Sequence, residues 1–127
     1  MADMGIFRID FEVASQVARD IHVTVAAALL DTGSEASWIP AGILESLGVP
    51  RLLRARYRQA SGNVIERWTG PVVIFAAGTF ASDDVVFAEP GDLTLLGART
   101  LEGLNVTVDP MTKRLVDAGP APAAAAA

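Results

Sequence analysis

Hydrophobic and polar residues alternate near the beginning of the chain. In the segment IFRIDFEV, residues 6–13, the side chains from Phe7 onward are alternately apolar and charged. This period of two is typical of a strand with one buried and one exposed face. The segment IHVTVAAALL, residues 21–30, begins with β-branched residues and then becomes almost continuously apolar. That pattern predicts a second strand that becomes buried on both faces.

Shorter patterns predict the remaining elements. Residues 40–48, PAGILESLG, match a short helix, because proline suits an early helical position and glycine suits the C-terminal cap. Turn residues between apolar stretches indicate hairpins. The further predicted elements are a hairpin over residues 54–68 that turns at Ser61, Gly62 and Asn63, two strands within 71–89 around Gly78, a strand at 93–97, a helical turn at 98–104 and a hairpin at 105–117 that turns at Asp109 and Pro110.

These elements add up to about six to eight short strands with one or two short helices. Many short strands at this spacing are typical of a closed barrel or a sandwich, so the expected fold class is all-β. The length of 127 residues suits one domain. We expect it to span residues 1–117, because the tail at 118–127 consists only of alanine, glycine and proline and should be disordered.

Composition narrows the class of protein further. Hydrophobic residues make up 51% of the chain and charged residues 20%, which is typical of a globular domain. The net charge of −5 argues against nucleic acid as a partner, because phosphate contacts need a clustered cationic surface. The absence of cysteine excludes disulfides and thiol chemistry. No apolar run approaches the ~18 residues of a membrane helix and no signal peptide is recognisable, so we expect a soluble, cytoplasmic protein.

Most familiar catalytic and metal-binding arrangements can be set aside. His22 is the only histidine and falls inside a predicted strand, where a partly exposed structural residue is the simpler interpretation. One histidine cannot form a multi-histidine metal site, and no carboxylate cluster has calcium-loop or metallohydrolase spacing. No metal or cofactor is therefore expected. The basic stretch, Arg51, Arg54, Arg56 and Arg58, is interpreted as the solvated face of a hairpin strand.

Asp31 is the residue that the hydrophobic pattern does not explain. It directly follows two leucines at the end of the second predicted strand, and burial of a carboxylate without partners is very costly. Thr32 and Ser34 can donate hydroxyl hydrogen bonds nearby, and Gly33 allows a close backbone approach. Taken alone, the tetrapeptide DTGS more often marks an ordinary turn at the end of a strand.

A wider pattern resembles the retropepsin-like aspartic proteases. The motif ALLDTGS resembles the active-site sequence of that family, in which apolar residues precede Asp, Thr or Ser, and Gly. The family has two bulky apolar residues and a glycine further on, and here Leu95, Leu96 and Gly97 fill those positions. Between the two motifs lies the hairpin at 54–68, with Gly62 where the family has its flap. The resemblance extends over residues 6–117. Within the family, the chain is most similar in pattern to the small bacterial and archaeal single-domain members.

The resemblance implies a closed acid-protease barrel that acts as a homodimeric peptidase. Such enzymes use two aspartates that share one proton: the ionised one activates a water, and the protonated one donates to the peptide carbonyl. Because DTG occurs once in this short chain, both carboxylates would be Asp31, one from each subunit of a two-fold dimer. The implied site residues are Asp31, Thr32 and Gly33 as the catalytic motif, Ser34, Leu96 and Gly97 as its support, and Ser61, Gly62 and Asn63 as the flap over a peptide substrate.

The resemblance also implies specific side-chain contacts. The Thr32 hydroxyls would bond across the two-fold axis, and the Ser34 hydroxyl would donate to the catalytic carboxylate. Retroviral members pair an Asp two residues after the motif glycine with an Arg directly after the second glycine. Here Glu35 and Ala98 hold those positions, which leaves a Glu35–Arg99 pair as the candidate substitute.

Two other functions stay open at this point. A non-catalytic retropepsin-like domain would dimerise, or would bind an extended peptide by strand addition beneath the flap. A small barrel that serves as a binding module and contains DTG by chance is the other alternative. The placement of Leu95, Leu96 and Gly97 argues against it.

Overall fold

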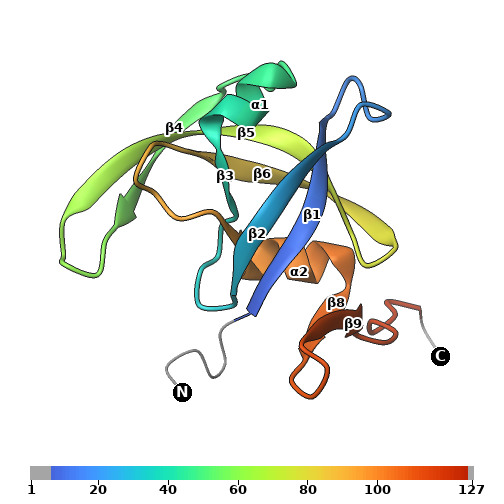
Figure 1. Cartoon of the computed structure of the whole chain (residues 1–127). Helices are drawn as coiled ribbons and strands as arrows, with labels where there is room; N and C mark the ends of the chain where they lie inside the picture. Colours follow the sequence, from blue (N-terminus) through green and yellow to red (C-terminus); the bar gives the residue numbers. More distant parts are fainter. Residues whose placement is uncertain (1–6, 126–127) are drawn as a thin grey trace.

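Strands dominate the computed structural model, which describes residues 7–125. Strands account for 51% of the structure and helices for 11%, so the all-β prediction is confirmed. The described residues form nine strands and two helices (Figure 1). The count exceeds the predicted six to eight, and the strand that the sequence did not predict is β3 (Trp38–Pro40), whose three residues are too few to produce a recognisable period.

Six of these strands close into a barrel. The ring is completed by antiparallel pairing of the first and fifth strands of the chain, and a further strand, β4 (Leu53–Arg58), extends from it. Two neighbouring pairs, β2–β7 and β3–β6, are parallel, and the other pairs in the ring are antiparallel. The strands follow one another around the barrel as β1 (Phe7–Ser15), β2 (Val23–Asp31), β7 (Leu95–Gly97), β3, β6 (Thr79–Ala88) and β5 (Val64–Ala76).

Strand β5 is longer than predicted and serves both the barrel and a projecting hairpin. The sequence predicted one strand that ends at residue 68 and another that begins at 71, but β5 runs without a break through Gly70 and Pro71. Up to Thr69 it pairs with β4, and from Val72 it pairs with β1. A Cβ atom on Gly70 would lie 2.1 Å from the Pro50 carbonyl oxygen. The Gly-Pro pair therefore marks an exchange of neighbours and not a gap between two strands.

Strand β2 contains a bulge that the sequence pattern did not reveal. The register with β1 shifts so that Ala26 and Ala27 together face the single residue Asp10. Ala27 has a φ of 54°, and its N–H donates to the Asp10 carboxylate at 2.8 Å. Both alanines are exposed, so the prediction that this segment becomes buried on both faces is wrong here. The bulge returns the apolar residues beyond it, beginning with Ala28, to the inside of the barrel.

The hydrophobic core fills the barrel and extends beneath two short helices. Helix α1 (Ala41–Ser46) buries Leu44, and Gly48 follows it with a φ of 73°, as its predicted terminating role requires. Helix α2 (Ala98–Leu104) buries Leu101 and Leu104. The largest apolar side chains that are almost fully inaccessible are Val13, Val25, Ile39, Leu44, Val72, Val73, Ile74, Val85, Val86, Phe87 and Leu96.

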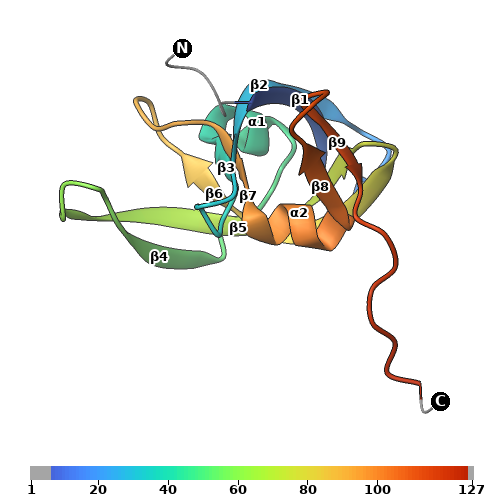
Figure 2. The same ribbon diagram turned by 90° about the horizontal axis from the view of Figure 1, so that it is seen from below.

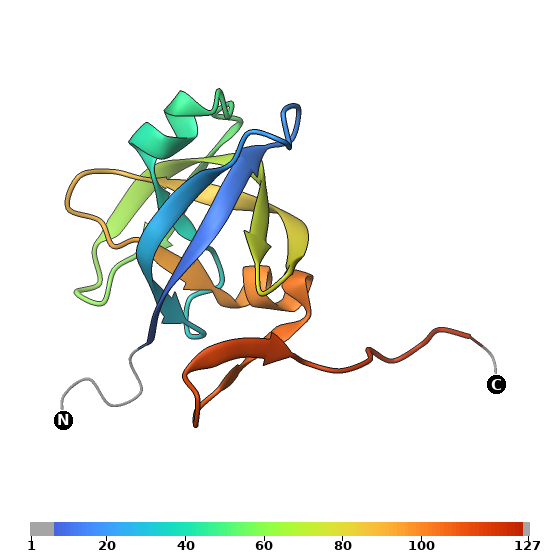
Figure 3. The ribbon, with the colours of Figure 1, turned by 45° about the vertical axis from the view of Figure 1, so that its right-hand side comes forward.

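The C-terminal hairpin forms a separate two-stranded sheet beside α2 (Figure 3). Its strands are β8 (Val106–Asp109) and β9 (Arg114–Asp117), as predicted. Asp109 shapes the turn, because its carboxylate accepts hydrogen bonds from the Met111 N–H and the Thr112 hydroxyl, both at 2.9 Å. Residues 118–125 form no helix or strand and run away from the barrel (Figures 2 and 3). Residue 6 of the predicted first strand and the last two residues of the tail lie outside the described residues.

Candidate active site

Asp31 ends strand β2, and its side chain is half-buried. The Gly33 N–H donates to the Asp31 carboxylate at 2.9 Å, and the Ser34 N–H donates to the Asp31 backbone carbonyl at 3.2 Å. A Cβ atom on Gly33 would lie 3.2 Å from the same carboxylate oxygen. Thr32 and Gly33 are exposed. The motif is therefore a tight turn that holds the carboxylate by a backbone hydrogen bond while leaving it access to solvent.

Gly97 lies opposite Asp31 on the neighbouring parallel strand β7. A Cβ atom at this position would lie 2.5 Å from the Ala36 carbonyl oxygen and 2.7 Å from that of Ser34. Real side chains do not make contacts that short, so only glycine fits between β7 and the loop that follows Asp31. The preceding Leu96 is fully buried in the core. The two sequence motifs are thus parts of one structural unit.

Helix α2 fixes the loop after Asp31 from its other side. The Ala98 N–H donates to the Ser34 carbonyl at 2.7 Å, and the Arg99 N–H donates to the Glu35 carbonyl at 3.0 Å. The first N–H groups of a helix have no partner within the helix, so the loop supplies acceptors that they need. The DTGS loop is therefore held by backbone contacts from both β7 and α2.

The Ser34 hydroxyl has a different partner from the one predicted. It donates to the Ala36 carbonyl at 2.9 Å. The hydroxyl has one hydrogen to donate, and the tight loop brings this carbonyl within reach, so the predicted donation to Asp31 is absent from the described chain. Ser34 supports the shape of the loop instead.

Arg99 also pairs differently from the prediction. Its guanidinium contacts the Asp83 carboxylate at 2.8 Å and donates to the Asp84 carbonyl at 2.6 Å. The contact with Asp83 raises the pKa of Arg99, and Glu35 adds only a smaller favourable charge. The predicted Glu35–Arg99 ion pair is therefore wrong, because β6 presents a nearer carboxylate.

Strands β4 and β5 form the predicted hairpin, and it projects well beyond the barrel (Figure 2). Gly62 lies at its tip with a φ of 94°, a conformation that favours glycine. The tip is closed by the Gln59 N–H, which donates to the Asn63 carbonyl at 2.7 Å, and Ser61 accepts a longer contact from the Asn63 N–H at 3.4 Å. Arg54, Arg56 and Arg58 are exposed along β4, as their interpretation as a solvated face predicted, whereas Arg51 lies before the strand and pairs with Glu45.

Two aromatic residues that the sequence analysis missed join this hairpin to the barrel. The rings of Tyr57 on β4 and Trp38 on β3 meet edge to face, with centroids 5.1 Å apart. Burial raises the pKa of the Tyr57 hydroxyl above its ordinary value. The alternation of Tyr57 with the arginines of β4 could have indicated that it faces the other way, but no local pattern points to Trp38 as its partner.

An ion pair anchors the base of the same hairpin. Arg67 of β5 makes two contacts with the Asp92 carboxylate, at 2.7 and 2.9 Å, from the loop that precedes β7. Both side chains are largely buried, with 15% and 13% of their surfaces exposed. The hydrogen bonds from Arg67 lower the pKa of Asp92, and Asp92 raises that of Arg67. This bidentate pair fixes where the hairpin leaves the barrel.

A mostly apolar hollow of about 230 Å³ adjoins the DTGS loop. Thr32 lines one side of it, and α2 and β8 line the others. Leu101, Val106 and Val108 belong to its apolar wall. The exposed part of the motif therefore borders a depression that a side chain could enter.

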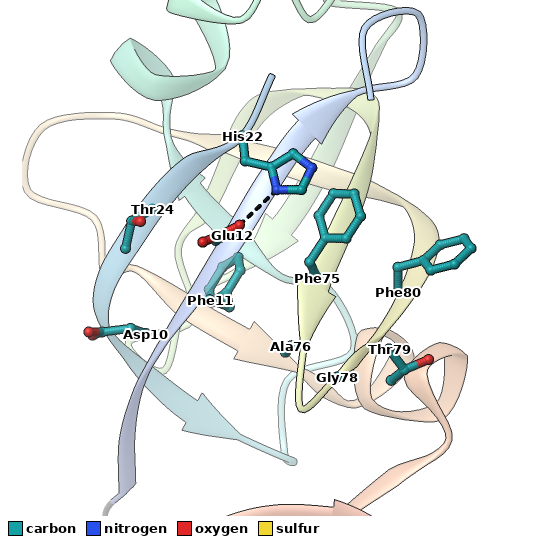
Figure 4. A pocket seen from close by; sticks show the side chains of 10 residues that line it. All are labelled: Asp10, Phe11, Glu12, His22, Thr24, Phe75, Ala76, Gly78, Thr79 and Phe80. Carbon is teal, nitrogen blue, oxygen red and sulfur yellow. Dashed lines mark hydrogen bonds and ion pairs between the residues drawn. The ribbon is translucent and has the colours of Figure 1, made fainter. Parts of the chain in front are cut away.

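A second hollow, of about 500 Å³, lies at the opposite end of β2 (Figure 4). His22 lines it, 2.7 Å from the Glu12 carboxylate and stacked on Phe75 with ring centroids 4.1 Å apart. The other ring nitrogen lies 2.7 Å from the Arg19 carbonyl. Both ring nitrogens are engaged within the chain, at the far end of the strand from Asp31. His22 is partly exposed, as predicted, although it lies just before β2 and not within it.

Among residues 7–125, no three His, Cys, Asp or Glu side chains are grouped so that they could hold a metal ion. No helix within the same range is long and apolar enough to cross a membrane. Comparison with protein-family models and with curated proteins finds no match. The candidate site is therefore supported by the geometry of this chain and not by a characterised relative.

Proposed function

We propose that this protein is a homodimeric aspartic endopeptidase in which each subunit contributes Asp31 to one shared active site. The observation that carries the proposal is the unit formed by Asp31 and Gly97. An aspartate ends a barrel strand, accepts a hydrogen bond from its own DTG turn, and faces a glycine that cannot be replaced by a larger residue. An ordinary Asx turn would not require that second, distant glycine.

We propose a dimer because one carboxylate alone cannot serve as both the base and the acid. Hydrolysis by aspartates needs one group to take a proton from water and another to donate a proton to the carbonyl oxygen. Asp31 is the only aspartate in a DTG motif in the chain. The exposure of Thr32 and Gly33 and the adjoining apolar hollow support a second copy as the missing partner.

Catalysis would then depend on two carboxyl groups held close together. Two carboxylates a few ångströms apart do not both ionise easily, so the pair retains one proton. The ionised Asp31 activates the attacking water, and the protonated Asp31 of the partner donates to the peptide carbonyl oxygen. The turn at Gly33 would keep each carboxylate oriented during this exchange.

An extended peptide would lie between the Asp31 pair and the hairpin of β4 and β5, which we propose is the flap. Gly62 at its tip permits a close approach of the backbone to the substrate. The Tyr57–Trp38 contact and the Arg67–Asp92 pair would set the position from which the flap closes.

The proposal is tested by digestion of a peptide library with the wild-type protein and with Asp31→Asn, side by side. Asparagine has a similar volume but cannot serve as the base, so the variant should lose cleavage while remaining folded. Sedimentation equilibrium at micromolar concentration should give a dimer for both proteins. A well-folded protein that is strictly monomeric, or a variant that cleaves like the wild type, would contradict the proposal.

A non-catalytic peptide-binding domain is the second candidate. The outer edge of β4 favours it, because within the described residues β4 pairs only with β5, and a free strand edge can accept another strand. The same library distinguishes the two functions. A binding domain would retain peptides equally well with Asp31→Asn and would produce no fragments with either protein.

A further inference from the structure

Three polar side chains form a buried chain of hydrogen bonds between β6 and the loop after Asp31. Ser37 and Thr100 have 0% and 1% of their surfaces exposed, and the Asp83 side chain has 6%. The Thr100 hydroxyl donates to the Asp83 carboxylate at 2.6 Å and lies 2.5 Å from the Ser37 hydroxyl. The Ser37 hydroxyl oxygen accepts the Gly97 N–H at 2.9 Å. We name this set of side chains the Asp83 relay.

The direction of every hydrogen bond in the Asp83 relay follows from the number of hydrogens. Thr100 has one hydroxyl hydrogen and donates it to Asp83, so it can only accept from Ser37. Ser37 must therefore donate to Thr100 while it accepts from the Gly97 N–H. The relay runs in one direction, from a backbone N–H through two hydroxyls to a carboxylate. A single direction of this kind polarises each member and strengthens its neighbours.

The carboxylate at the end of the relay is itself held in place. Its second oxygen contacts the Arg99 guanidinium at 2.8 Å, and Arg99 belongs to the first turn of α2. The positive charge of Arg99 offsets part of the cost of burying the Asp83 carboxylate. Asp83 therefore joins β6 both to α2 and to the loop.

At its other end, the Asp83 relay binds the N–H of the residue that faces Asp31. Gly97 lies opposite Asp31 in the parallel pair of β2 and β7, and its N–H is the group that the relay holds. Ser37 follows the DTGS loop, whose carbonyls lie too close to Gly97 for any Cβ atom. A shift of Gly97 would therefore move the loop that carries Asp31.

We propose that Asp83 is a positioning residue for Asp31, acting through Thr100 and Ser37 on Gly97. This inference rests on the proposed peptidase function for its catalytic consequence, but the relay itself can be measured without catalysis. The side chain that the test should change is Thr100. Valine matches its shape and removes the hydroxyl, whereas serine keeps the hydroxyl.

The geometric part of the test uses amide hydrogen exchange of Gly97. Thr100→Val removes the acceptor of the Ser37 hydroxyl, so exchange at Gly97 should accelerate and its amide resonance should shift. Thr100→Ser should keep both close to the wild-type values. The matched control is Thr24→Val on the exposed start of β2, which should leave Gly97 unchanged. Unchanged exchange at Gly97 in Thr100→Val would overturn the relay.

The catalytic part of the test separates kcat from KM. Displacement of a catalytic group by a fraction of an ångström to 1 Å lowers turnover, so kcat should fall between about tenfold and a hundredfold in Thr100→Val, with KM nearly unchanged. Thr100→Ser should recover most of the loss, and Thr24→Val should match the wild type. All proteins are compared at concentrations where sedimentation gives the same oligomeric state.

The two ways of failing are distinct. If the wild type cleaves peptides and Thr100→Val has an equal kcat, the positioning role is wrong and the peptidase stands. If accelerated exchange at Gly97 appears in Thr100→Val but the wild type cleaves nothing in the library, the peptidase proposal fails, and with it the catalytic role of Asp83. A loss of kcat that Thr100→Ser does not recover would also contradict positioning through the hydroxyl.

Discussion

Asp31 and Gly97 face each other on the parallel strands β2 and β7, and no residue larger than glycine fits at position 97. They are 66 positions apart in the chain, but they form one unit. The first supplies the carboxylate and the second leaves space for the loop behind it. Both motifs of the sequence are explained by this single arrangement.

Replacement of Gly97 should be costly for stability. Gly97→Ala places a Cβ atom 2.5 Å from the Ala36 carbonyl oxygen, so the loop or β7 must move. We expect a loss of about 2 kcal/mol or more in the free energy of unfolding. The matched control is Gly42→Ala in α1, where nothing lies within 4 Å of the added atom and helix propensity favours alanine. Urea denaturation measures both, and equal stability of the two variants would contradict the packing described at Gly97.

The Arg67–Asp92 pair should make stability depend on pH. The pKa of Asp92 is lowered from 3.8 by hydrogen bonds from Arg67, so the folded state favours the ionised carboxylate. This contribution is fully present above the unfolded pKa and is lost as the pH falls through the lower folded value. The melting temperature of Asp92→Asn should lie below that of the wild type at pH 6, and the two should converge as the pH falls below about 4. A constant difference across that range would show that the pair does not carry the effect.

His22 should titrate above the ordinary value for histidine. Its hydrogen bond with Glu12 raises the pKa from 6.5, and both ring nitrogens face acceptors, which favours the doubly protonated ring. The stabilising contribution is therefore present below about pH 6.5 and is lost as the pH rises through the folded value. Because His22 is the only histidine, proton NMR gives its titration directly. Glu12→Gln should lower the pKa, and a wild-type value at or below 6.5 would contradict the contact.

Two glycines at hairpin tips allow the role of the flap to be separated from its stability. Gly62 and Gly78 both have positive φ angles, 94° and 76°, and open space around them, so valine strains both backbones alike. Gly62→Val should lower kcat/KM, because the proposed flap can no longer approach the substrate closely. Gly78→Val, at the far end of the barrel, should lose similar stability without losing turnover. If the two variants have the same melting temperature and lose kcat/KM equally, the hairpin of β4 and β5 is only an edge of the barrel.

The sequence predicted the elements well where one local pattern decided them. The alternation in β1, the turn at Gly62 and the helix that follows Pro40 all appear as predicted, since each depends on neighbours in the chain. It was wrong where tertiary structure changed the meaning of a local signal. Separate strands were predicted up to residue 68 and from residue 71, but β5 continues through Gly70 and Pro71 and changes partners there.

The candidate site was predicted as a set of motifs but not as a set of contacts. DTGS and the later Leu-Leu-Gly were recognisable because each is contiguous in the sequence. The partner of Arg99 was not, because Asp83 and Glu35 are both carboxylates and only the fold decides which is nearer. The family resemblance implied that the Ser34 hydroxyl donates to Asp31, whereas the local path of the loop brings it to the Ala36 carbonyl.

The central claim, one active site built from two copies of Asp31, is tested most directly by mixed dimers. The wild type and Asp31→Asn are refolded together in varied ratios at constant total concentration, and the rate of peptide cleavage is measured. If each site needs Asp31 from both subunits, only the pure wild-type dimer cleaves, so the rate should fall as the square of the wild-type fraction, to about a quarter in an equal mixture. A rate proportional to that fraction, about half in an equal mixture, would show that each subunit acts alone and would contradict the account.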